Sequence, residues 1–107
     1  MQLSEKKCVP CEGGVKPFTR TEALKYLKQV NNWTLKGNEI EKEFVFKDFK
    51  EVLGFINKVG EIAEAEGHHP DIYLHSYKKV KIILSTHAIK GLSENDFILA
   101  AKIDKLI

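Results

Sequence analysis

Apolar residues recur along the chain with two different spacings, and the change from one to the other predicts the order of elements. Three segments carry them three and four positions apart, which is the spacing of an amphipathic helix. They begin near residues 20, 49 and 94. Each follows a residue whose side chain can cap a helix, and these are Thr19, Asp48 and Ser93. The sequence therefore predicts three capped helices.

The first and last helices carry the fuller capping signal. Thr19 is followed three positions later by Glu22, and Ser93 by Asp96, so both match a capping box. The first helix is expected over about residues 20–30. The buried stripe expected for the middle helix is Phe49, Val52, Leu53, Ile56, Val59, Ile62 and Ala63. Gly67 suits a left-handed residue at the end of this helix, and Pro70 prevents the helix from continuing through the two residues before it.

Four shorter segments read as strands. They cover about residues 33–35, 39–46, 72–75 and 80–87, and the last is expected to end near His87. In the second, Ile40, Phe44 and Phe46 share one face, which is typical of a half-buried antiparallel strand. The order αββαββα predicts an α+β fold, with one four-stranded antiparallel sheet and helices on one face. Residues 1–17 show no periodicity and are expected to form an irregular leader before a single domain over residues 18–107.

Composition narrows the class of protein. With 107 residues, 43% hydrophobic and 30% charged, the chain is long enough for one modest soluble domain. No apolar run approaches the roughly 18–20 residues that cross a bilayer, and the N-terminus lacks the apolar region of a signal peptide, so a cytoplasmic protein without a membrane partner is expected. The net charge is only +2 and Arg20 is the single arginine, which argues against a nucleic-acid partner.

The two cysteines form an isolated pair. Cys8 and Cys11 are spaced C-x-x-C, but a zinc ribbon or finger needs a second pair of ligands, and the histidines lie some sixty residues away. The pair precedes Glu12-Gly13-Gly14 rather than a strand-to-helix turn. Free, reduced thiols are therefore favoured over a metal or redox site.

Three of the four histidines lie in two short stretches at junctions between predicted elements. His68 and His69 follow the middle helix, with Glu64 one turn earlier, and His87 ends the fourth strand. Imidazoles titrate near neutrality, so such a cluster suits general acid–base chemistry. Three other interpretations stay open: the paired histidines interact with the end of the helix dipole, the three histidines bind a metal, although adjacent ligands strain a tetrahedral site, and Asp96 is simply a helix-capping carboxylate.

Over residues 18–107 the chain resembles the pterin-4a-carbinolamine dehydratases. The matching motifs, in this order and spacing, are Glu64-x-x-x-His68-His69-Pro70, Tyr77-x-x-Val80, Thr86-His87 and Gly91-Leu92-Ser93-x-x-Asp96. The resemblance implies dehydration of a 4a-hydroxytetrahydropterin to the quinonoid dihydropterin, without a metal or organic cofactor. His68 and His87 then form the acid–base pair, and His69 binds and orients the pterin. Glu64 and Asp96 support the histidines, Pro70 belongs to the substrate-binding motif, and the assembly is a homodimer or homotetramer.

The resemblance departs from animal-type members at two points and leaves two other classes of function open. Animal-type members carry a tryptophan two positions after the motif proline, where this chain has Ile72, and the spacing to the Thr-His pair is one residue longer. The alternative to an enzyme is a non-catalytic binding or assembly module on the same scaffold. A metal-dependent hydrolase that uses the same histidines ranks third.

Overall fold

The computed structural model describes residues 2–9 and 16–107, and these residues contain a four-stranded sheet. The strands are β1 (Thr34–Lys36), β2 (Glu39–Val45), β3 (Asp71–His75) and β4 (Lys79–Leu84). Their order across the sheet is β1-β2-β4-β3, and each neighbouring pair is antiparallel. The two outer strands are therefore β1 and β3, and β2 and β4 pair at the centre.

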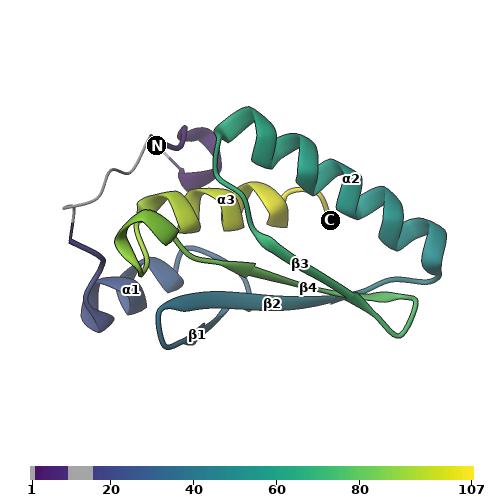
Figure 1. The fold of residues 1–107 in the computed structure, drawn as a ribbon, viewed down its shortest axis with the longest axis horizontal. Coiled ribbons are helices and arrows are strands. Elements are labelled where there is room, and N and C mark those ends of the chain that lie inside the picture. The colour runs from purple at the N-terminus through teal and green to yellow at the C-terminus, as the bar shows by residue number, and fades with distance from the viewer. Residues whose placement is uncertain (1, 10–15) are drawn as a thin grey trace.

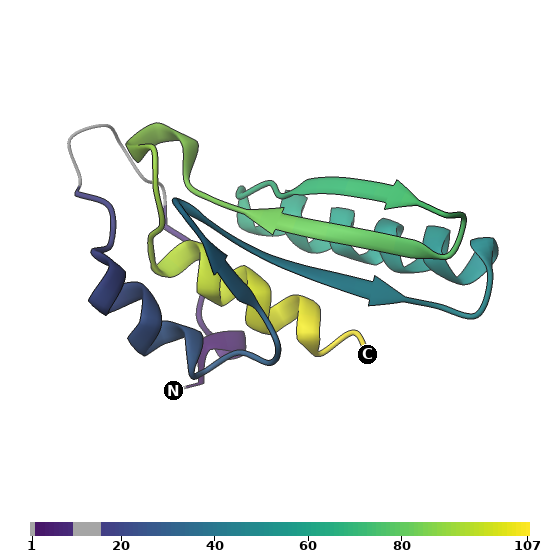
Figure 2. The ribbon, with the colours of Figure 1, turned by 90° about the horizontal axis from the view of Figure 1, so that it is seen from below.

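Two helices cover one face of this sheet. They are α2 (Phe49–Glu66) and α3 (Glu94–Asp104), and both lie on the same side of the strands in Figure 1. Figure 2 shows the strands in front of these helices. A shorter helix, α1 (Arg20–Leu27), precedes β1, and the described residues also contain the 3-10 turns η1 (Leu3–Glu5) and η2 (His87–Ile89). The predicted α+β class and the order αββαββα are confirmed.

The helix ends are fixed by the capping residues that the sequence indicated. The side chains of Thr19, Asp48 and Ser93 each accept a backbone hydrogen bond from the first turn of their helix. The first and third of these also form the full capping box, with Glu22 and Asp96. At the other end of α2, Gly67 has φ 65°, the left-handed conformation expected of it.

The buried side of α2 differs from the predicted stripe. Phe49 and Leu53 are 48% and 41% exposed, whereas Phe55 is 5% exposed. The ring of Phe55 lies 4.8 Å from that of Phe44 and 4.9 Å from that of Phe46, centroid to centroid. The aromatic residues at the end of β2 therefore set which face of α2 is buried, and helical spacing alone could not show this contact between distant segments.

Two predicted boundaries are wrong. The first helix ends at Leu27 rather than residue 30, and Asn32 shortly afterwards adopts φ 62°. The fourth strand ends at Leu84, so His87 does not end a strand but begins η2. Between Leu84 and His87, Thr86 forms an isolated antiparallel bridge with Gly91. This bridge closes a short loop that carries His87.

The last helix lies at the centre of the packing. Five of its apolar side chains are at most 1% exposed: Phe97, Ile98, Leu99, Ala100 and Ile103. A helix that is buried on most of its circumference is surrounded by other elements, and α3 packs against α2, α1 and η1. Among the helices that the structure describes, none combines the length and the apolar character needed to cross a bilayer.

Candidate active site

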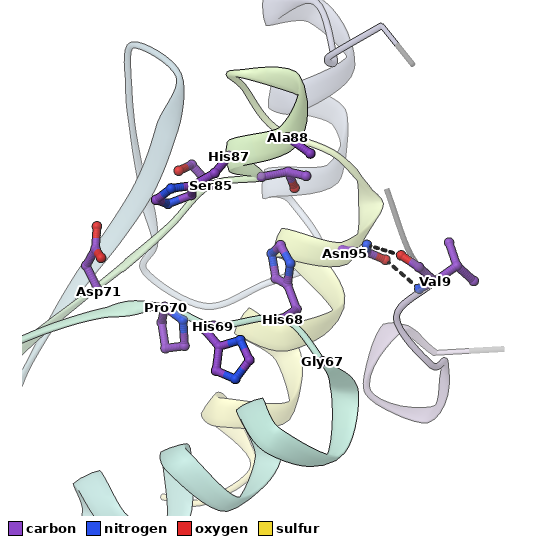
Figure 3. A pocket seen from close by; sticks show the side chains of 11 residues that line it. Val9, Gly67, His68, His69, Pro70, Asp71, Ser85, His87, Ala88 and Asn95 are labelled. Carbon is purple, nitrogen blue, oxygen red and sulfur yellow. Dashed lines mark hydrogen bonds between the residues drawn. The ribbon is translucent and has the colours of Figure 1, made fainter. Parts of the chain in front are cut away.

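The loop after α2 and the loop after β4 meet at one end of the sheet and enclose a cavity of about 380 Å³. A cavity of this size is in the range that holds small organic ligands. Figure 3 shows the two loops facing each other, with the histidine rings between them. The lining residues are Val9, Gly67, His68, His69, Pro70, Asp71, Ser85, Thr86, His87, Ala88 and Asn95.

Local backbone conformation places the two adjacent histidines differently. Gly67 turns the chain out of α2, and the backbone N–H of His68 still donates to the carbonyl of Ala63 over 3.2 Å. Pro70 then leads directly into β3, where the backbone is extended. As a result, the imidazole of His68 is held against α3, whereas that of His69 lies beside the last turn of α2 (Figure 3).

His68 forms a short contact with a buried carboxylate. Its Nε2 lies 2.6 Å from Oδ1 of Asp96, the third residue of α3. The two side chains are 11% and 0% exposed. A carboxylate at this distance orients the ring and favours the tautomer that carries a proton on Nε2.

Asp96 is itself held by donors on its second oxygen. Its Oδ2 accepts from the Thr86 hydroxyl over 2.8 Å and from the Ser93 backbone N–H over 3.0 Å. The Thr86 and Ser93 hydroxyl oxygens are 2.9 Å apart. Asp96 therefore caps its own helix and contacts an imidazole at the same time, so the capping interpretation does not exclude the supporting one.

His69 has a much looser partner. Its Nε2 lies 3.4 Å from Oε2 of Glu64, and the two side chains are 61% and 81% exposed. Glu64 does not line the cavity, and it is the carboxylate of Asp96 that contacts His68. In water an ion pair of this kind contributes about 0–1 kcal/mol.

His87 enters the cavity from the opposite side. It is the first residue of η2 and is exposed, and it follows Thr86 directly. Because Thr86 bonds to Asp96, the loop that carries His87 is connected to the partner of His68. Figure 3 places His87 beside Ser85, across the cavity from the loop of His68 and His69.

Four of the six predicted site residues line the cavity, and the other two lie behind the rings. His68, His69, Pro70 and His87 form its walls, and Asp96 and Glu64 contact a histidine from outside. Their catalytic and binding roles stay predictions. The remaining histidine, His75, lies on β3, where its Nε2 is 2.7 Å from Oε2 of Glu43. No group of three or more potential metal ligands gathers anywhere within residues 2–9 and 16–107.

Several residues of the site were not predicted. Thr86 belongs to the quoted Thr-His motif, but only the tertiary structure shows its bond to Asp96. Asn95 lies next to Asp96, and it is 4% exposed, which no periodic pattern indicates for a polar residue in a first helical turn. Val9 comes from the leader and lies beside Asn95 at the edge of the cavity (Figure 3).

Comparisons with known proteins agree on one family. The model of the family described as pterin 4 alpha carbinolamine dehydratase matches residues 16–106. A protein of Halorhodospira halophila is 51% identical over an alignment of 108 positions, which covers 99% of this chain and 98% of that protein. A protein of Alkaliphilus metalliredigens is 50% identical over 105 residues, with 96% and 94% covered. Both are provisionally named pterin-4-alpha-carbinolamine dehydratases.

Solved structures show the same fold. A transcriptional coactivator/pterin dehydratase from Brucella melitensis superposes with a TM-score of 0.79 at 30% identity, over 85% of this chain and 98% of that one. A pterin dehydratase-like protein, described as a RuBisCO assembly factor of the alpha-carboxysome, gives a TM-score of 0.57 at 24% identity, over 70% of this chain and 86% of that one. The second likeness concerns the fold alone.

Proposed function

The chain belongs to the pterin-4-alpha-carbinolamine dehydratase family, and from this we propose that it removes water from a 4a-hydroxytetrahydropterin by acid–base catalysis between histidines. The observation that carries the proposal is the meeting of His68, His69 and His87 around one cavity, with His68 held by buried Asp96. In the reaction, the 4a-hydroxyl takes a proton and leaves as water. N5 loses its proton, and the C4a–N5 bond becomes double.

His68 fits the role of the base. Asp96 favours the proton on Nε2, so Nδ1 carries the lone pair that can accept a proton from N5. Once protonated, the imidazolium is stabilised by the adjacent carboxylate, as in other His–Asp pairs that accept protons. The Thr86 hydroxyl and the Ser93 backbone N–H hold this carboxylate in place beside the ring.

His87 then supplies the proton to the leaving hydroxyl. It lies on the other loop, is exposed to solvent and can exchange protons with water between turnovers. The proton given by His87 and the proton taken by His68 balance, so the pair returns to its starting state by transfer through solvent. His69, which is more loosely held, binds and orients the pterin ring.

The test measures the decay of a 4a-hydroxytetrahydropterin by stopped-flow absorbance for the parent and three variants. Removing a positioned acid or base costs about 10²–10⁴-fold in rate, so His68→Ala and His87→Ala are expected to lose activity by that order. The matched control is His75→Ala, because His75 also pairs with a carboxylate but does not line the cavity. An inactive parent, or a loss in His75→Ala as large as in the other two, contradicts the proposal.

A further inference from the structure

The leader is bound to both of the elements that hold the His68–Asp96 pair. The residues concerned are Cys8 and Val9, which lie between η1 and the start of residues 10–15. In Figure 1 η1 lies over α3, and Cys8, three residues after η1, bonds to the last residue of α2. His68 follows α2 by two residues, and Asp96 is the third residue of α3. The leader therefore contacts the two helix ends whose separation sets the distance between the imidazole and its carboxylate.

On the side of α2 the contact is made by Glu66. The backbone N–H of Cys8 donates to Oε1 of Glu66 over 2.7 Å. Glu66 is the last residue of α2, and its other carboxylate oxygen lies 3.7 Å from the ammonium of Lys102 on α3. The Glu66 side chain is only 13% exposed, so water competes weakly for it.

On the side of α3 the contact is made by Asn95. Its Oδ1 accepts from the Val9 backbone N–H over 3.0 Å, and its Nδ2 donates to the Val9 carbonyl over 2.6 Å. This pair of bonds saturates the backbone of one residue as a neighbouring strand does. Figure 3 draws both bonds at the edge of the cavity. Asn95 directly precedes Asp96, so the same turn of α3 holds the leader and His68.

The thiol of Cys8 completes the contact as a neutral group. Its Sγ lies 3.6 Å from the Asn95 carbonyl oxygen, to which it donates. Burial, followed by the charge of Glu66, raises the pKa of Cys8 to about 12. The thiol consequently stays protonated at neutral pH, which suits a structural donor rather than a nucleophile.

We propose that the Cys8–Val9 segment is a clamp that positions the His68–Asp96 pair, with Glu66 and Asn95 as its positioning residues. It ties the end of α2 to the first turn of α3, and it forms part of the cavity rim next to the histidines. The kinetic part of this inference rests on the proposed dehydratase function. Its structural part concerns only the contact between His68 and Asp96.

Other residues of the leader have further anchors, and one of them, Lys6, supplies a control. Leu3 is buried in the core at 5% exposure. The ammonium of Lys6 lies 2.8 Å from Oε2 of Glu94, and that of Lys102 donates to the Ser4 carbonyl over 2.9 Å. None of these residues lines the cavity. Lys6→Ala therefore weakens the attachment of the leader without breaking the clamp.

The experiment compares five variants with the parent, of which Lys6→Ala is the control. Glu66→Ala removes the acceptor of the Cys8 N–H, and Glu66→Gln keeps an oxygen there. Val9→Pro removes the N–H that donates to Asn95, and Val9→Ala keeps it. Because Val9 is 64% exposed, neither of its substitutions disturbs the core. Each variant is measured for kcat and KM, and for the NMR signal of the His68 Nε2 proton, assigned by its absence in His68→Ala.

We expect Glu66→Ala and Val9→Pro to lower kcat roughly tenfold, because a small displacement of a catalytic group from its reacting position lowers the rate. Their His68 N–H signal should broaden through faster exchange with water. Lys6→Ala should stay within about twofold of the parent and keep the signal. Glu66→Gln and Val9→Ala should lose less kcat than Glu66→Ala and Val9→Pro, because they keep the oxygen and the N–H of the clamp. If Glu66→Ala fails to fold, Val9→Pro decides, since its side chain is on the surface.

The two readouts separate this inference from the proposed function. An active parent whose kcat and His68 signal are unchanged in Glu66→Ala and Val9→Pro overturns the clamp and leaves the dehydratase standing. Equal losses in Lys6→Ala also overturn it, because general loosening of the leader then explains the effect. An inactive parent overturns the proposed function, and the His68 signal in the same variants still decides whether the clamp holds the pair.

Discussion

His68 and His69 are neighbours in the sequence, and each faces a carboxylate, but their two environments differ in almost every respect. The His68–Asp96 pair is separated by 2.6 Å and nearly excluded from water, whereas the His69–Glu64 pair is separated by 3.4 Å and mostly exposed. The second oxygen of Asp96, Oδ2, accepts from two further residues, Thr86 and Ser93. A carboxylate can fix an imidazole only when its own position is fixed, and the buried network around Asp96 provides this.

A third histidine–carboxylate pair shows that a short distance between nitrogen and oxygen does not by itself create the environment of His68 and Asp96. His75 and Glu43 are 2.7 Å apart, nearly as close as the buried pair, but their side chains are 27% and 38% exposed. They lie on β3 and β2, away from the cavity. In each of the three pairs an imidazole contacts a carboxylate. The pairs differ in how deeply they are buried and in the other donors that surround the carboxylate.

The largest effect is expected for Asp96→Asn. The amide cannot accept hydrogen bonds on both of its atoms, so it conflicts with the donors from His68, Thr86 or Ser93. We expect kcat to fall about 100-fold and the free energy of unfolding to fall by about 1–3 kcal/mol. Stopped-flow kinetics and urea unfolding measure the two quantities. The same change at the exposed pair, Glu64→Gln, should alter each only slightly, and equal effects at both positions contradict the distinction.

A smaller effect is expected for Thr86→Val, which preserves shape but removes one donor to Asp96. The hydroxyl is buried and donates over 2.8 Å, so its loss should cost about 1–2 kcal/mol of stability. We also expect a roughly tenfold fall in kcat, because the carboxylate that orients His68 becomes less constrained. Thr34→Val, at an exposed position of β1, is the matched control. A change in Thr86→Val no larger than in Thr34→Val shows that the network does not hold Asp96.

The sequence predicted those parts of the molecule that depend on local signals. Capping residues at Thr19, Asp48 and Ser93 located the helix starts, and Gly67 with Pro70 located the end of α2. These capping and helix-ending signals involve only residues close in the sequence, so they do not depend on the packing of distant segments. The exposure of Phe49 and Leu53, and the burial of Phe55 instead, depend on aromatic residues of β2 that local spacing cannot report.

For the candidate site, too, the sequence indicated the residues but not the contacts between them. Motif order brought out the histidines and Asp96, but it did not show which carboxylate meets which ring. Asp96 rather than Glu64 contacts His68, since the chain turns at Gly67 and carries His68 away from the last turn of α2. The contribution of Cys8 and Val9 depends on backbone groups, which leave no trace in side-chain patterns. The homo-oligomeric assembly and the cytoplasmic location stay predictions.

His69→Ala should affect binding more than turnover. His69 lines the cavity, but its ring is held only by the weak contact with Glu64. We expect KM to rise up to about tenfold while kcat changes by less than about threefold, because a residue that binds substrate and transition state equally alters KM alone. Initial rates over a range of pterin concentrations separate the two constants. A fall in kcat as large as in His68→Ala assigns His69 to proton transfer and removes the contrast between the neighbours.

The smallest effect is expected for the pair on the sheet, and it should depend on pH. The hydrogen bond from His75 lowers the pKa of the Glu43 carboxyl below its ordinary value of 4.5. A carboxyl whose pKa is lower in the folded state contributes stability above the unfolded-state pKa, and this contribution is lost as the pH falls through the folded-state value. His75→Ala should therefore melt slightly below the parent at about pH 5.5, and the gap should close at about pH 3. Melting temperatures at the two pH values measure it, with kcat unchanged. A gap that widens on acidification, or a loss of turnover, means that this exposed pair contributes to the fold or the reaction as the buried one does.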